Sequence, residues 1–112
     1  MLIKEERRER LLPKGIPRYI KCFDSGEKFA DRYTVIFTGR YVGHIPLAWE
    51  YLAMSAMPFH PQGVGQHGEM NQTTSLKHLG KRIEFSELPE DCQELVLQDY
   101  CDIWGVHDES VR

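Results

Sequence analysis

The stretch Pro89-Glu-Asp-Cys-Gln-Glu-Leu-Val-Leu-Gln-Asp-Tyr-Cys-Asp-Ile-Trp104 has the pattern of an amphipathic helix. Pro89 suits the first turn, where its missing N–H is not needed, and Glu90 and Asp91 suit the positive end of the helix dipole. Gly105 is a natural stop. Apolar residues recur at spacings of three and four, namely Cys92, Leu95, Val96, Tyr100, Ile103 and Trp104. We therefore predict a helix over residues 89–104 with one apolar face.

Segments upstream of this helix have the composition of strands. Arg32-Tyr-Thr-Val-Ile-Phe-Thr38 is rich in β-branched and aromatic residues, and residues 18–23 and 81–85 form two shorter candidates. Residues 47–55 fit either a strand or a helix, and we assign a strand because the preceding strand and connection look like one arm of a hairpin. The sequence thus predicts an α+β fold, in which one C-terminal helix packs on a small antiparallel sheet of about four strands.

Length and composition indicate one domain. The chain has 112 residues, of which 41% are hydrophobic, with five Tyr, five Phe and two Trp. This is enough to build one core without disulfides. Residues 1–14 read as an N-terminal arm, either a short helix or a frayed segment, that ends at Pro13. We expect a single α+β domain over residues 15–106 and a C-terminal tail over residues 107–112.

Cysteine usage and hydropathy predict a cytoplasmic protein without a membrane partner. No apolar run approaches the roughly 20 residues that span a bilayer. Cys22, Cys92 and Cys101 form no CxxC pair, and the last two lie about 13 Å apart along the predicted helix. An odd number of unpaired cysteines suits a reducing compartment.

Between the strands lies Pro58-Phe-His-Pro-Gln-Gly-Val-Gly-Gln-His-Gly-Glu69. Two prolines and three glycines argue against a regular helix or a central strand. The sequence predicts a long Gly/Pro-rich loop here, running on through Ser75. Structureless connections of nearly twenty residues are uncommon in compact domains and are usually functional or mobile.

Three blocks of sequence carry a resemblance to other proteins. They are Asp31-Arg-Tyr-Thr-Val35, the loop Pro58–Gly68, and His78-Leu-Gly-Lys81 together with Leu88–Val96. They resemble a group of short, uncharacterised proteins from bacterial, phage and mobile-element genomes that share a PFHPQGxGQHG loop. The resemblance spans about residues 17–105 and implies a genomic setting, not a mechanism.

The loop supplies most candidate site residues. His67 and Glu69 are the candidate catalytic pair, a base with its orienting carboxylate. Candidate binding residues are His60, Gln62, Gln66, His67, Glu69, Arg32, Arg40 and His78. A candidate partner surface lies on the predicted helix and consists of Glu90, Asp91, Glu94 and Asp102.

Neither a metal site nor a complete catalytic motif follows from these residues. His60, His67 and His78 lack the close pairing typical of zinc ligands, so we expect no metal and no cofactor. Gly63-Val-Gly65 followed by Gly68 resembles GxGxxG, but no helix is predicted after it. No nucleophile elbow is present, because the glycines flank Val64 and Gln66. The loop can equally be structural, with its polar side chains satisfying its own backbone.

Charge is divided unevenly along the chain. Residues 1–40 hold ten Lys/Arg against six acids, and residues 84–112 hold nine acids against one base. The leading prediction is a non-enzymatic binding protein of a phage or mobile element that acts through protein–protein interaction. One concrete form is an anti-defence inhibitor of a host nuclease complex, whose carboxylates take the place of phosphates.

Two alternatives remain open. One is a small enzyme or a ligand- or phosphate-binding domain that uses the His/Glu/Gly-rich loop. The other is nucleic-acid binding through the basic N-terminal half, with Tyr19 and Tyr41 as stacking groups. The net charge of −3 disfavours the second alternative, because it provides no overall basic field.

Overall fold

A computed structural model describes residues 2–26, 30–39, 48–71 and 75–106, with side chains from Glu6 onward. Its helices and strands, in chain order, are α1 (Leu2–Leu11), β1 (Ile20–Asp24), β2 (Tyr33–Phe37), β3 (Ala48–Met54), β4 (Gly65–Asn71), β5 (Lys81–Ile83) and α2 (Glu90–Trp104). Short 3-10 turns occupy Pro13–Gly15, Lys77–Leu79 and Phe85–Glu87.

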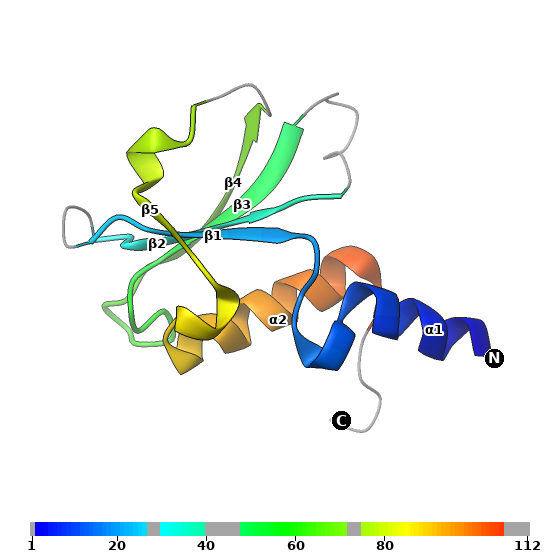
Figure 1. Cartoon of the computed structure of the whole chain (residues 1–112). Coiled ribbons are helices and arrows are strands. Elements are labelled where there is room, and N and C mark those ends of the chain that lie inside the picture. Colours follow the sequence, from blue (N-terminus) through cyan, green and yellow to red (C-terminus); the bar gives the residue numbers. More distant parts are fainter. Residues whose placement is uncertain (1, 27–29, 40–47, 72–74, 107–112) are drawn as a thin grey trace.

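The five strands form one antiparallel sheet in the order β4-β3-β2-β1-β5, and α2 packs across one of its faces (Figure 1). The predicted α+β class is therefore confirmed. The predicted strands appear as β1, β2, β3 and β5, and the segment that fitted either a strand or a helix is a strand over Ala48–Met54. The helix starts at Glu90 because Pro89 serves as its N-cap residue.

The fifth strand, β4, corrects the prediction of a long loop. Residues 65–71 pair along the whole length of β3, with Leu52 opposite His67 and Tyr51 opposite Gly68. A Cβ atom built on Gly68 would lie 2.4 Å from the Tyr51 ring, so the ring rests directly on the β4 backbone. Pairing with β3 thus makes a strand of a sequence with low strand propensity.

The core lies between α2 and the facing side of the sheet. Leu52 and Val35 are fully buried there against Val96 and Tyr100 of α2. Within the described residues, no helix is long and apolar enough to span a membrane.

Helix α1 is tied to the end of α2. Leu11 and Leu12, placed by the sequence in an N-terminal arm, are buried in the core. The Tyr100 hydroxyl donates a hydrogen bond to the Leu11 carbonyl at 2.6 Å. Arg7 and Arg8 donate to the carbonyls of Trp104 and Val106, where the α2 dipole favours positive charge. The first helix is therefore part of the folded unit.

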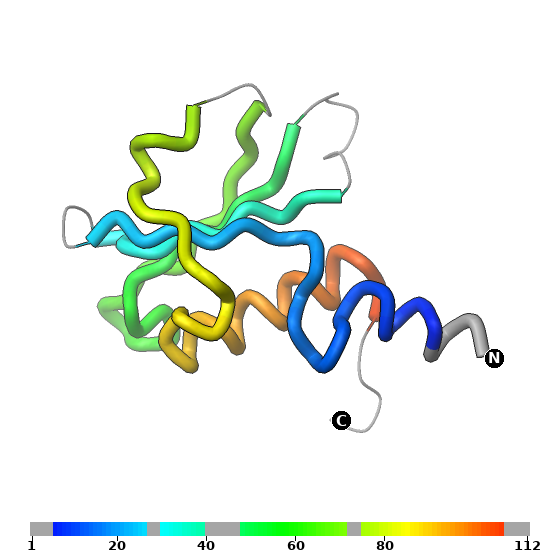
Figure 2. The backbone as a smooth tube through the Cα atoms, in the orientation of Figure 1, coloured from blue at the N-terminus to red at the C-terminus, as the bar shows by residue number. Residues whose placement is uncertain are grey.

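The opposite face of the sheet is concave. Strands β3 and β4 bend away from α2 on one side, and the segment around Lys77–Leu79 rises on the other (Figures 1 and 2). Phe23, Ile36 and Ala53 are buried on this face, because they alternate along their strands with residues that contact α2. We call it the concave face.

Candidate functional site

A cleft of about 360 Å³ lies between β4 and the C-terminal half of α2. Four acidic residues and one histidine border it, above an apolar floor. The described lining residues are Phe37, Glu50, His67, Gly68, Glu69, Asp99, Asp102 and Ile103. We call this hollow the acidic cleft.

Strand pairing places the acidic side chains of the sheet at this cleft. His67 and Glu69 are two residues apart in β4 and therefore share a face. Glu69 lies directly opposite Glu50 of β3. Like charges directly across two strands destabilise a sheet, so this pair favours occupation of the cleft by a cation.

His67 is paired with a residue that the sequence did not indicate. Its Nε2 atom lies 2.5 Å from Asp99 Oδ2, which joins β4 to α2. The His67 side chain is 65% exposed and that of Asp99 17% exposed. The carboxylate hydrogen-bonded to His67 Nε2 is thus Asp99 of α2 and not Glu69.

The three loop histidines do not converge. His60 lies in an exposed turn, where its Nδ1 accepts a hydrogen bond from the Gln62 backbone N–H. His67 lines the acidic cleft, whereas His78 lines a pocket on the concave face. In the described parts of the chain, no three His, Cys, Asp or Glu side chains are grouped to hold a metal. The structure thus separates residues that were expected to share one site.

The remaining predicted binding residues are also dispersed. Gln66 is exposed and alternates with His67, so it faces the concave side of the sheet. Arg32 lies on the β1–β2 connection, directly before Tyr33, which pairs with Met54 at the end of β3. Arg40 lies outside the described residues.

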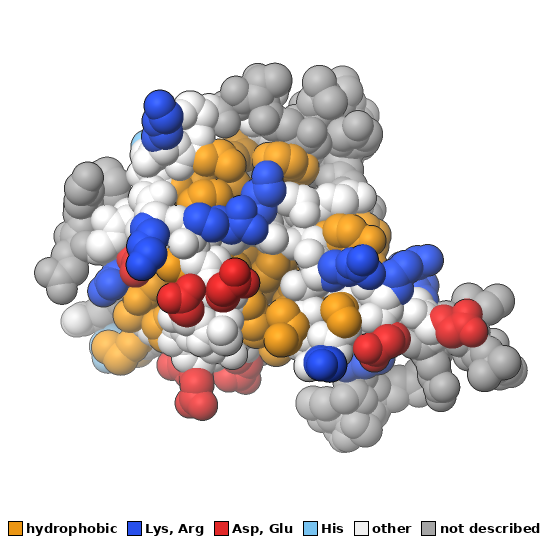
Figure 3. Space-filling view, in the orientation of Figure 1, with side chains coloured by type: hydrophobic (Ala, Val, Ile, Leu, Met, Phe, Trp, Pro, Cys, Tyr) orange, Lys and Arg blue, Asp and Glu red, His pale blue; other side chains and the backbone are white. Residues whose placement is uncertain are grey.

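The predicted partner surface on α2 is exposed. Glu90, Asp91, Glu94 and Asp102 all face solvent, and Asp102 also borders the acidic cleft. Figure 3 shows acidic side chains gathered around the first turn of α2. The sequence did not assign Asp99 or Glu50 to a site. In the sequence, Asp99 is an acidic residue at the edge of the mainly apolar face of the helix, and Glu50 is an acidic residue within an apolar strand. These positions are the only sequence features that could have pointed to them.

A second hollow, of about 410 Å³, lies on the concave face. Its apolar wall consists of Tyr51, Ala53, Met70 and Leu79, and its polar rim includes Asp31 and His78. Beside it, the Lys21 ammonium lies 5.0 Å from the centroid of Trp49, and the Arg82 guanidinium 5.8 Å from that of Phe23. Cations and aromatic rings therefore alternate on this face.

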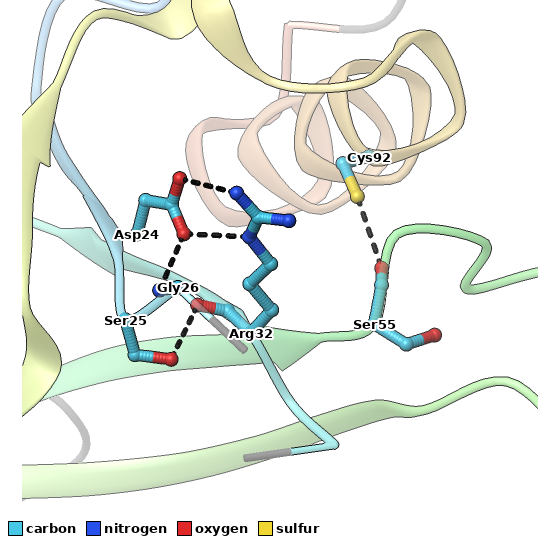
Figure 4. Close-up of polar contacts among 6 residues, drawn as sticks. All are labelled: Asp24, Ser25, Gly26, Arg32, Ser55 and Cys92. Carbon is cyan, nitrogen blue, oxygen red and sulfur yellow. Dashed lines mark hydrogen bonds and ion pairs between the residues drawn. The ribbon is translucent and has the colours of Figure 1, made fainter. Parts of the chain in front are cut away.

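Arg32, directly before β2, forms an ion pair with Asp24 at the end of β1 (Figure 4). Its Nε lies 2.7 Å from Asp24 Oδ1 and its second terminal nitrogen 3.1 Å from Oδ2, while Oδ1 also accepts from Gly26 N–H. The Arg32 side-chain hydrogen bond lowers the pKa of Asp24 below 3.8. Arg32 is thus a structural residue in this fold.

The Asp24–Arg32 pair gives a pH prediction. Because the folded-state pKa of Asp24 is lowered, its contribution to stability is present above about pH 4 and is lost as the pH falls through the folded-state value. We expect Asp24→Asn to lower stability at pH 7 by at most about 1 kcal/mol, because the pair is partly exposed. Urea unfolding from pH 7 to pH 2 should show this difference shrink below pH 4. A difference that grows on acidification contradicts the prediction, and Asp31→Asn is the control.

Cys92 joins α2 to the end of β3, because its thiol donates to the Ser55 carbonyl at 3.2 Å (Figure 4). Burial raises the pKa of Cys92 to about 11 and that of Cys22 to about 12. Cys101 is only partly buried. We expect a thiol reagent at pH 8 to label at most one cysteine of the native protein, Cys101, and all three in denaturant. Fast labelling of Cys22 or Cys92 in the native state, measured by peptide mass spectrometry, contradicts this burial.

No family model, curated protein or solved structure matches the chain.

Proposed function

We propose that the protein is a non-enzymatic binding protein whose acidic cleft takes a basic segment of a protein partner. The observation that carries this proposal is the Glu50–Glu69 cross-strand pair, which shares one cleft with Asp99 and Asp102. No Lys or Arg is among the described residues that line the cleft. A basic side chain entering it would relieve the repulsion between the two glutamates.

The shape and chemistry of the cleft suit Lys or Arg of a partner. The apolar stem of such a side chain can lie along Phe37 and Ile103 while its charged head meets the carboxylates. A hydrolase is less well supported, since the described lining offers no Ser, Thr or Cys as a nucleophile beside His67. The exposed acids at the start of α2 extend the negative field and would steer a basic partner.

The genomic resemblance suggests a more specific form of this proposal. A partner with a basic groove for nucleic acid would meet carboxylates in place of phosphates. An inhibitor of a host defence nuclease complex would bind a partner of that kind. The acidic residues at the start of α2 support this form of the proposal only through their charge.

The test uses octa-arginine amide as a defined basic probe, titrated by calorimetry at physiological salt. The double variant Glu50→Gln/Glu69→Gln removes two charges from the cleft, and Glu90→Gln/Glu94→Gln removes two from α2 outside the described lining of the cleft. We expect the first to weaken binding at least tenfold, or about 1.4 kcal/mol, and the second less than threefold. Equal losses would mean a non-specific charge effect and overturn the proposal.

A separate observation favours nucleic acid as a second candidate ligand. The stacked pairs Lys21–Trp49 and Arg82–Phe23 on the concave face combine positive charge with aromatic rings. In this version Trp49, which is partly exposed, is the stacking group instead of Tyr19 and Tyr41, while Phe23 is buried beneath Arg82. Anisotropy with fluorescent dT12 should show salt-dependent binding that Lys21→Ala weakens. Absence of binding at 50 mM salt removes this candidate.

A further inference from the structure

Strand β4 is a long edge of the sheet. It has seven residues, whereas β5 at the opposite edge has three. Within the described part of the chain, the backbone of residues 65–70 pairs only with β3. An edge strand leaves alternate N–H and C=O groups directed away from its neighbour. Residues 65–71 contain neither Lys nor Pro, which commonly protect such edges from pairing.

The acidic cleft and the pocket on the concave face both border this strand. His67, Gly68 and Glu69 line the acidic cleft, while Glu69 and Met70 line the pocket of the concave face. The two hollows therefore lie on opposite faces of the sheet at its β4 edge. Alternate side chains of an added strand would point toward one hollow and then the other.

We propose that an extended segment of a partner protein, with alternating basic and apolar side chains, pairs with β4 as a sixth strand. This inference rests on the proposed function, since it specifies how the basic segment binds. Basic side chains enter the acidic cleft, and apolar ones contact Tyr51, Ala53 and Met70 on the concave face. Main-chain hydrogen bonds supply affinity and the two hollows supply specificity.

Charge argues against a second copy of this chain as the added strand. Pairing of β4 with β4 would bring one acidic cleft beside another, with Glu69 of each copy near the carboxylates of the other. Like charges placed together across an interface suppress such pairing. A basic segment of a different protein is complementary to the same surface.

The test uses the peptide acetyl-Lys-Val-Lys-Val-Lys-Val-Lys-amide as the probe. Two further versions carry N-methyl groups on either the valines or the lysines, and each blocks the hydrogen-bond donors along one edge of the extended peptide. We expect the unmodified peptide to bind and to slow hydrogen exchange of alternate amides in residues 65–70. One methylated version should lose at least tenfold in affinity while the other retains binding.

The outcomes separate this inference from the proposed function. If both methylated peptides bind like the parent, or if exchange in β4 is unchanged, strand addition is overturned while binding in the cleft stands. Strand addition is also overturned if octa-arginine binds through the cleft but the alternating peptide does not bind. If neither peptide depends on Glu50 and Glu69, both proposals fail. The block peptide acetyl-Lys-Lys-Lys-Lys-Val-Val-Val-amide controls for composition and should bind at least tenfold more weakly than the alternating one.

Discussion

Replacing Leu52 by alanine is expected to lower the free energy of unfolding by about 2–5 kcal/mol. Leu52 is fully buried in β3, between Val35 of β2 and the α2 side chains of the core. The substitution removes buried methyl groups and leaves a cavity that paired strands on both sides prevent from closing. For a domain of this size the melting temperature should fall by roughly 10 °C or more, measured by circular dichroism.

The matched control is Ile16→Ala, which also truncates an aliphatic side chain. Ile16 is 47% exposed, so its substitution should change stability by less than about 0.5 kcal/mol. Similar melting temperatures for the two variants would contradict the position assigned to Leu52. Leu52 pairs with His67 of β4. If Leu52→Ala lowers the free energy of unfolding less than expected and speeds hydrogen exchange of the β4 amides, the substitution acts mainly on the pairing of β3 with β4.

Gly63→Ala is expected to be the other severe substitution. A Cβ atom at Gly63 would lie 2.0 Å from the Met57 carbonyl oxygen and 3.0 Å from that of His60. The two turns that create this contact are held by His60 N–H donating to Met57 and Gly63 N–H donating to His60. Backbone atoms cannot rotate away as a side chain can, so we expect a loss of about 3 kcal/mol, at the upper end for overpacking.

Gly65→Ala provides the comparison within the same segment. There the nearest side-chain atom to an added Cβ is 3.4 Å away, on Leu95, which is an ordinary contact. Alanine also lowers the entropy of the unfolded chain, so we expect a change within about 1 kcal/mol. Urea unfolding of both variants distinguishes the two glycines. Equal stability of the two would show that the turn adopts another conformation.

The elements predicted from the sequence are those whose periodicity reflects burial. The three- and four-residue spacing of α2 and the β-branched run of β2 follow directly from the faces they bury. Strand β4 lacks such a signal, because its residues are mostly glycine and polar and it buries little. Its conformation depends on pairing with β3. No local sequence pattern identifies β3 and β4 as partners. The same holds for Leu11 and Leu12, whose burial depends on the end of α2.

The candidate site was predicted only in part for a similar reason. The sequence singled out His67 and Glu69, and both border the acidic cleft. Their partners Asp99 and Glu50 come from α2 and β3, and Asp99 lies 32 residues from His67 along the chain. The three histidines are separated because three different elements carry them: His60 lies in the exposed turn, His67 in β4 and His78 in the 3-10 turn Lys77–Leu79. These relations exist only once the register of β3 and β4 is fixed.

The contact between the Tyr51 ring and Gly68 bears on how this region tolerates changes of length. Only glycine fits beneath the ring, so a shift of β4 by one position would place His67 or Glu69 there and create a clash. A single-residue insertion between Gly65 and Gly68 would also exchange the side chains that face α2 with those that face the concave side. One added residue in the exposed turn at residues 58–62 would alter neither arrangement. Insertions and deletions among natural variants should therefore be absent from Gly65 to Gly68.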